Sequence, residues 1–118
     1  MKLNAFGHAI RVARAQVGIT MMKMAEELGA KPAFLSAMET GRSKIPAAWV
    51  EKIDQYFKAN GAPIEKIREL ADAANKSVSI EKLPLQHQLL VSGFAKSELT
   101  AEQLDAVASF LKKLQRKE

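Results

Sequence analysis

Apolar residues recur at helical spacing through most of the chain, and each break in the pattern carries glycine, proline or threonine. The first helix is predicted over Asn4 to Val17, and Gly18 ends it. Thr20 can cap a second helix that runs to Leu28, and Gly29 supplies a left-handed exit from it. The expected inward positions of the first helix are Ala5, Ile10, Ala13 and Val17.

Three further helices follow, and each is opened by a proline. Pro32 is well placed as the first residue of a helix that ends at Thr40, with Gly41 directly after it. A fourth helix is predicted over Pro46 to Gly61, and a fifth begins at Pro63. The expected inward positions of the second to fifth helices are Met21, Met24, Ala25, Leu28, Leu35, Met38, Val50, Ile53, Phe57, Ile64, Ile67, Leu70, Ala71 and Ala74.

The pattern changes after Lys76. Polar and apolar residues alternate over residues 77–81, which predicts one short strand or an extended link. A strand here would need a partner, and a second copy of the protein is the expected one. A helix is then predicted over Leu85 to Ala95, and another begins at Thr100. The apolar residues of this last helix stand three, four and three positions apart, in an a/d-like stripe of Leu104, Val107, Leu111 and Leu114.

The predicted fold class is therefore all-α. Residues 1–76 form one domain of five helices, and residues 77–118 form a link and two C-terminal helices. A length of 118 residues suits this organisation, and 47% apolar with 26% charged residues suits a soluble globular core.

Composition also limits the chemistry. The chain has no cysteine, which excludes disulfides, thiolate metal sites and thiol nucleophiles and favours a reducing compartment. No apolar run is long enough to span a membrane, and residues 1–4 do not open a signal peptide, so a cytoplasmic protein with no membrane partner is expected. The formal charge is +5, with seven Lys and Arg against three Glu in residues 1–45, which is compatible with a polyanionic partner. A second basic run closes the chain at residues 112–118.

Enzymatic interpretations find little support. His8 and His87 have no metal-ligand or nucleophile spacing, and the chain has no phosphate-cradling glycine loop. The acidic residues of the predicted helix surfaces, Glu26 with Glu27 and Glu65 with Glu69, are typical of solvated faces. We expect no catalytic residues, no metal site and no cofactor.

Two segments carry a family resemblance. The stretch from Arg14 to Gly29, followed by the stretch from Pro32 to Pro46, resembles the phage-repressor (Cro-like, xenobiotic-response-element type) helix-turn-helix regulators. The resemblance covers roughly residues 4–60. It implies a five-helix DNA-binding domain in which the helix from Pro32 to Thr40 enters the major groove.

The resemblance also implies roles for single residues. Ala25 is the small residue that lets the second and third helices approach, and Gly29 is the turn glycine. Arg14 and Glu39 correspond to a basic and acidic pair that ties the first helix to the end of the third, although two solvated surface charges would give the same sequence.

The face that would meet base edges departs from the family pattern. Only Lys31 and Ser36 can hydrogen-bond a base, and Met21 stands where relatives often have glutamine. Affinity would then rest on phosphate contacts, and specificity partly on DNA shape. The residues expected to contact DNA are Thr20, Met21, Lys23, Lys31, Pro32, Ala33, Phe34, Ser36, Ala37, Arg42, Ser43 and Lys44.

The expected function is that of a transcriptional regulator, a repressor that binds an operator in double-stranded DNA as a homodimer. Alternatives are a protein-interaction module, such as an antirepressor or adaptor, and an antitoxin that neutralises a toxin. The C-terminal helices could instead fold back and complete a monomeric core. The residues expected to form the dimer are Val78, Ile80, Leu90, Phe94, Leu104, Val107, Leu111 and Leu114.

Overall fold

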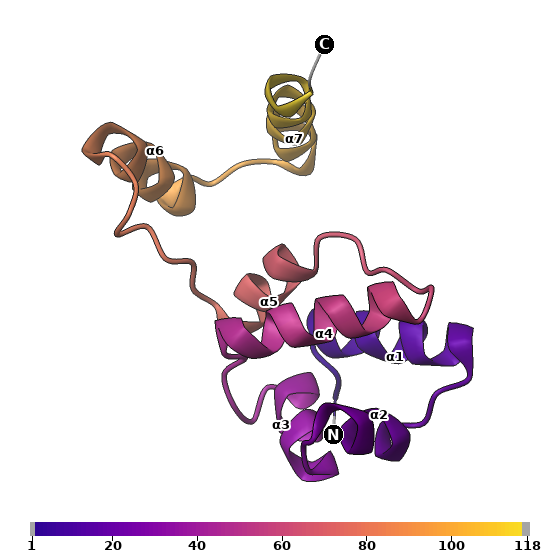
Figure 1. The fold of residues 1–118 in the computed structure, drawn as a ribbon. Helices are drawn as coiled ribbons and strands as arrows, with labels where there is room; N and C mark the ends of the chain where they lie inside the picture. Colours follow the sequence, from indigo (N-terminus) through magenta and orange to yellow (C-terminus); the bar gives the residue numbers. More distant parts are fainter. Residues whose placement is uncertain (1, 117–118) are drawn as a thin grey trace. The chain divides into compact units, whose positions relative to one another are not determined.

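A computed structural model describes residues 2–116, and within this range the protein has seven helices and no strand (Figure 1). The prediction of an all-α fold is confirmed. Residues 117 and 118, the end of the basic run, lie outside the described residues. The helices are α1 (Ala5–Val17), α2 (Met21–Leu28), α3 (Pro32–Thr40), α4 (Ala47–Ala59), α5 (Ile67–Asn75), α6 (Leu85–Lys96) and α7 (Ala101–Gln115).

The chain divides into two compact units, and the boundary between them in the sequence lies between Val78 and Ser79. The N-terminal unit contains α1 to α5, in which α1 contacts α3 and α5, α2 contacts α3, and α4 contacts α5. Its core is an apolar cluster drawn from every one of these helices and from two loops. The buried members are Phe6, Ile10, Ala13, Met24, Ala25, Leu35, Met38, Ile45, Val50, Ile53, Phe57, Ala62, Ile67 and Ala71.

Capping side chains and glycines determine where the first three helices begin and end. The Asn4 side chain accepts from the Gly7 amide at 2.7 Å and caps α1, and Thr20 accepts from the Lys23 amide at 3.0 Å and caps α2. The helices α1, α2 and α3 each end at a glycine in the left-handed conformation, where a side chain would be strained.

Two sequence predictions about this unit are wrong. The fifth helix begins at Ile67 and not at Pro63, because Lys66 has a φ of 56°, which a right-handed helix cannot contain. The segment before it buries Ala62 and half-buries Ile64 against the core, so packing prevails over helical continuity here. In α1, Ala5 is exposed and Phe6 takes the inward position.

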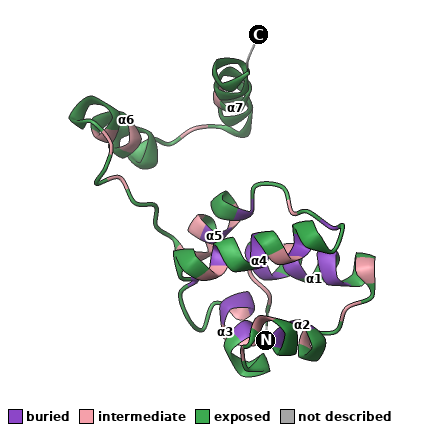
Figure 2. Cartoon of the chain, in the orientation of Figure 1, coloured by how far each residue is buried: buried purple, intermediate pink, exposed green. Residues whose placement is uncertain are grey.

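The C-terminal unit contains α6 and α7, and none of their side chains is buried (Figure 2). The helix α7 begins with a capping box, in which Thr100 and Gln103 each accept from the other's backbone amide. Residues 77–80 have no regular secondary structure, so the alternating pattern there corresponds to a link and not to a strand.

Candidate nucleic-acid interface

The helices α2 and α3 form a tight two-helix motif. Gly29 ends α2 with a φ of 70°, and the Ala30 amide donates to the Ala25 carbonyl at 2.9 Å. Ala25 is buried, and its side chain is a single methyl group. The small residue and the glycine together allow α3 to turn sharply out of α2.

The rest of the unit does not cover the start of α3. Lys31, Pro32 and Ala33 are exposed, and Ser36 and Ala37 one turn later are half-buried. The opposite side of the same helix carries Leu35 and Met38, which are buried in the core. An exposed helical edge with a fixed inner face is a shape that can enter the major groove of DNA.

The start of α2 lies on the same two-helix motif and offers a second set of candidates. Thr20 and Lys23 are exposed, and the Thr20 hydroxyl is already engaged as the helix cap. Met21 is half-buried and packs against the core cluster. Of these three predicted contacts, only Thr20 and Lys23 therefore present polar groups to solvent.

A basic loop follows α3 directly. Arg42, Ser43 and Lys44 are exposed, and the amides of Arg42 and Ser43 both donate to the Ala37 carbonyl, at 3.0 and 3.2 Å. These two bonds hold the start of the loop against the end of α3, while the side chains of all three residues remain exposed. Two cationic side chains beside an exposed helical edge suit contact with phosphates.

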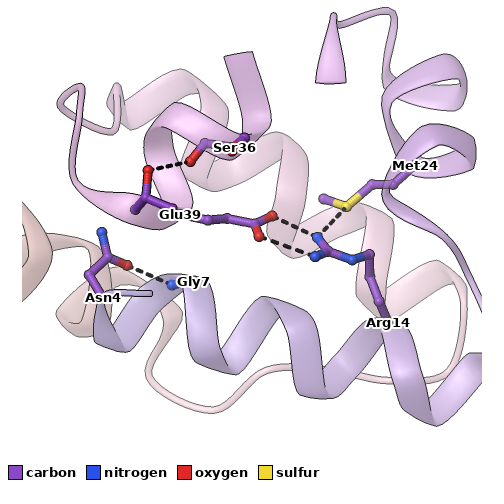
Figure 3. A network of polar contacts seen from close by, with 7 residues as sticks. Asn4, Gly7, Arg14, Met24, Ser36 and Glu39 are labelled. Carbon is purple, nitrogen blue, oxygen red and sulfur yellow. Dashed lines mark hydrogen bonds and ion pairs between the residues drawn. The ribbon is translucent and has the colours of Figure 1, made fainter. Parts of the chain in front are cut away.

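Arg14 and Glu39 form the ion pair that the resemblance implies, inside the unit (Figure 3). The guanidinium donates to both carboxylate oxygens, at 2.6 and 3.1 Å, and to the Met24 sulfur at 3.6 Å. The side chains retain 9% and 4% of their accessible surface, so the alternative of two solvated charges is wrong. The pair joins the last turns of α1 and α3 and fixes the position of α3 against α1.

The start of α1 holds the same end of α3 from another side (Figure 3). The Asn4 side chain donates to the Met38 carbonyl, and the Asn4 amide donates to the Glu39 carbonyl, both at 2.9 Å. A Cβ atom on Gly7 would lie 2.2 Å from the Glu39 carbonyl oxygen. Gly7 is therefore required for this close approach of α1 to α3.

A family model described as a helix-turn-helix domain matches residues 5–67, just over half of the chain. The chain belongs to the helix-turn-helix family. No curated protein and no solved structure matches it. The matched region of this helix-turn-helix protein runs from the first residue of α1 to the first residue of α5, and the family assignment indicates a DNA-binding regulator.

An aromatic cluster beside α3 was not predicted from the sequence of this helix-turn-helix protein. The Phe34 and Trp49 rings meet edge to face with 5.0 Å between their centroids, and the Lys52 ammonium lies 4.5 Å from the Trp49 ring centroid. Phe34 thus packs toward α4 and keeps 36% of its surface exposed. The paired aromatic residues at the starts of α3 and α4 were the available signal.

A second group missed by the sequence interpretation surrounds Asp54, which is buried. Its carboxylate forms an ion pair with Lys58 at 3.0 Å and accepts a hydrogen bond from Arg68 at 3.2 Å. Tyr56 on the same helix donates to Glu27 at 2.6 Å, and burial, followed by this bond, raises the pKa of Tyr56 to about 12. The i,i+4 spacing of Asp54 and Lys58 was the signal for the first of these contacts.

The residues expected to form a dimer lie in or next to the C-terminal unit and are poorly covered. Leu90, Phe94, Leu104, Leu111 and Leu114 are exposed, as is Val78, while Ile80 and Val107 are half-buried. An apolar groove between α6 and α7 is lined mainly by Leu90, Val91, Phe94, Val107 and Leu111. His87 also lines this groove, and His8 is exposed on α1.

Two further properties concern the described range alone. None of the helices found between residues 2 and 116 combines the length and apolar character needed to cross a membrane. The same residues contain no group of three or more His, Asp or Glu side chains that could hold a metal ion.

Proposed function

We propose that this helix-turn-helix protein is a sequence-specific regulator that binds double-stranded DNA and represses transcription by occupying an operator. The observation that supports this most directly is the outer edge of α3, where Lys31, Pro32 and Ala33 are exposed and Ser36 and Ala37 are half-buried, followed by the basic loop Arg42–Lys44. In the proposed complex, α3 lies in the major groove. Arg42, Ser43 and Lys44 contact phosphates on one side of it, and Thr20 and Lys23 contact them on the other.

Base readout in this proposal is limited to few groups. Lys31 and Ser36 are the residues on the outer edge that can donate hydrogen bonds to bases. Pro32, Ala33 and Ala37 can contact only apolar groups such as the thymine methyl. Specificity would then depend partly on the shape and stiffness of the operator.

We further propose that the protein acts as a homodimer, in the cytoplasm, where its DNA partner would be. Residues 1–76 are the proposed DNA-binding domain, and residues 77–118 the proposed dimerisation segment. The support is the uncovered apolar face of α6 and α7, which a second copy would bury. Two copies would read an inverted repeat with half-sites about 34 Å apart.

Titration of DNA at several salt concentrations tests the proposal, with DNA from immediately upstream of the gene and unrelated duplex as competitor. Arg42→Ala and Lys44→Ala should weaken binding to both duplexes equally and reduce the salt slope by about one each. Lys31→Ala and Ser36→Ala should weaken binding mainly to the specific site. If the parent binds no duplex at low salt, the proposal is wrong.

A second candidate function is a protein-interaction module. Pro32 and Ala33 are exposed beside Phe34, and together they give the start of α3 an apolar surface that a partner protein could cover. The same titration separates the two functions. If the parent binds no duplex at low salt, the interaction module is the function that remains. Four alanine variants that bind DNA like the parent would instead show that the placement of α3 in the major groove is wrong.

A further inference from the structure

The C-terminal end of the basic loop Arg42–Lys44 is held by hydrogen bonds to Asn75 of α5. The Ile45 amide donates to the Asn75 side-chain oxygen at 2.8 Å, and the Asn75 side-chain nitrogen donates to the Ile45 carbonyl at 3.1 Å. One asparagine therefore satisfies both backbone groups of Ile45, whose own side chain is buried. This two-way bond holds the chain at the point where the loop ends.

The other end of the loop is held by α3, through the bonds of the Arg42 and Ser43 amides to the Ala37 carbonyl. Three residues with exposed side chains thus lie between two fixed points. The loop needs little further ordering when it meets a ligand, since its backbone is already confined.

Asn75 also touches the loop through its own backbone. The Lys44 ammonium donates to the Asn75 carbonyl at the end of α5, where the helix carbonyls attract a cation. An ammonium group has three donors, so this bond leaves two for another acceptor. The contact directs Lys44 without consuming its capacity to bind a phosphate.

The helix that carries Asn75 is itself firmly placed. Ile67 and Ala71 of α5 are buried in the core, and α5 contacts both α1 and α4. A side chain on a packed helix has a better defined position than one on a loop, so it can fix the conformation of a neighbouring loop.

We infer that Asn75 is a positioning residue for DNA binding, which holds the Arg42–Lys44 loop in the conformation that meets phosphates. This inference rests on the proposed function, because the loop's ligand is duplex DNA. Asn75 touches no nucleotide in this arrangement, and it acts through Ile45 and Lys44.

Asn75→Ala removes the side-chain bonds and keeps the backbone carbonyl that Lys44 contacts. Binding of a short labelled duplex of arbitrary sequence should weaken about tenfold, because the loop must be ordered anew on each encounter. The salt slope should stay near that of the parent, since both cations remain, whereas Lys44→Ala lowers it by about one. Asn75→Asp, which can still accept from the Ile45 amide, should fall between the parent and the alanine variant.

Coupling to the loop separates positioning from general stability. In a protein that already carries Arg42→Ala and Lys44→Ala, adding Asn75→Ala should change the affinity less than about twofold, because little remains to be positioned. Hydrogen exchange gives a readout without DNA, in which the Ile45 amide should exchange at least about tenfold faster in Asn75→Ala than in the parent.

Two control variants match this substitution. Asn60→Ala removes a similar bond, from the Asn60 side chain to the Tyr56 carbonyl at 2.8 Å, at the exposed end of α4. Ile53→Val weakens the core at a buried residue of α4, outside the loop sequence. Both should bind the duplex like the parent at a temperature where every variant is folded.

An Asn75→Ala protein that binds as tightly as the parent would overturn the inference alone. A full tenfold loss in the Arg42→Ala, Lys44→Ala background would also overturn it, because Asn75 would then act elsewhere. A parent that binds neither this duplex nor the upstream DNA would instead overturn the proposed function, and the inference with it.

Discussion

The two units of this protein obey the same local rules and differ in what covers their helices. Both have helices with clear side-chain caps, Thr20 on α2 and the Thr100 capping box on α7. In the N-terminal unit the apolar faces meet one another and bury fourteen apolar residues. In the C-terminal unit neither helix buries a side chain, and leucine and phenylalanine residues are half or more exposed at several positions.

The comparison shows that helical periodicity and capping fix where a helix forms, while its stability in water depends on a surface that covers the apolar face. The five N-terminal helices provide that surface for each other. The C-terminal pair has an apolar stripe and groove whose cover we propose to be a second copy.

The largest expected effect is on this proposed dimer. Leu111→Asp combined with Leu114→Asp should convert a dimer to a monomer in sedimentation equilibrium, because burying one leucine contributes about 1.5–3 kcal/mol. Two such losses weaken association by roughly a hundredfold or more. Ser109→Asp, which adds one of these two negative charges away from the apolar stripe of α7, is the control for charge on the helix and should remain dimeric.

Truncation after Lys76 gives the complementary measurement. The shortened chain should be a folded monomer with weaker operator binding, since each half-site loses its tethered neighbour. A truncated chain that still dimerises would place the interface in residues 1–76. One that unfolds would favour the monomeric-core arrangement.

The next largest effect concerns the buried ion pair of the N-terminal unit. Arg14→Ala or Glu39→Ala should each cost about 3–5 kcal/mol of unfolding free energy, because the remaining charge is left buried without its partner. The double variant should be less damaged than the sum of the two. Denaturant unfolding of the four proteins measures the coupling, and strict additivity would contradict it.

Much of the N-terminal unit could be predicted from its sequence, because its signals are local. The helix ends at Gly18, Gly29 and Gly41 follow from conformational preference, and α3 has the predicted bounds. The pairing of Arg14 with Glu39 was available only through the family resemblance, since no local rule joins residues 25 positions apart.

The features that the sequence did not predict are those set by tertiary packing. The start of α5 depends on how Ala62 and Ile64 meet the core, and the burial of Asp54 depends on Arg68 from another helix. The link between Asn75 and Ile45 spans 30 positions and carries no motif. For the C-terminal helices, the apolar face predicted from the sequence is present in the structure, and it is exposed.

A smaller effect tests the difference between the units with one type of substitution. Gly7→Ala should cost about 2 kcal/mol or more of unfolding free energy, since its Cβ would lie 2.2 Å from the Glu39 carbonyl oxygen and force α1 from α3. Gly93→Ala in α6 meets nothing within 4 Å, so it should stabilise its helix by about 1 kcal/mol. Thermal unfolding followed by circular dichroism would show the opposite signs. Equal effects at both glycines would contradict the close approach at Gly7.

The smallest expected effect lies on the surface of the N-terminal unit, where Arg68 donates to Glu51 at 2.7 and 2.5 Å. Both side chains are about half exposed, so solvent screens the pair and Glu51→Gln should change the thermal midpoint only slightly at neutral pH. The hydrogen bonds from Arg68 lower the pKa of Glu51 below its ordinary value of 4.5. A lowered carboxyl pKa gives stability that is present above pH 4.5 and is lost as the pH falls through the folded-state pKa.

The small difference in thermal midpoint between the parent and Glu51→Gln should therefore disappear in acid. Glu65→Gln, at an exposed glutamate before α5, controls for removal of a charge. A difference that is large at neutral pH, or that persists in acid, would show that Glu51 stabilises the unit by another contact.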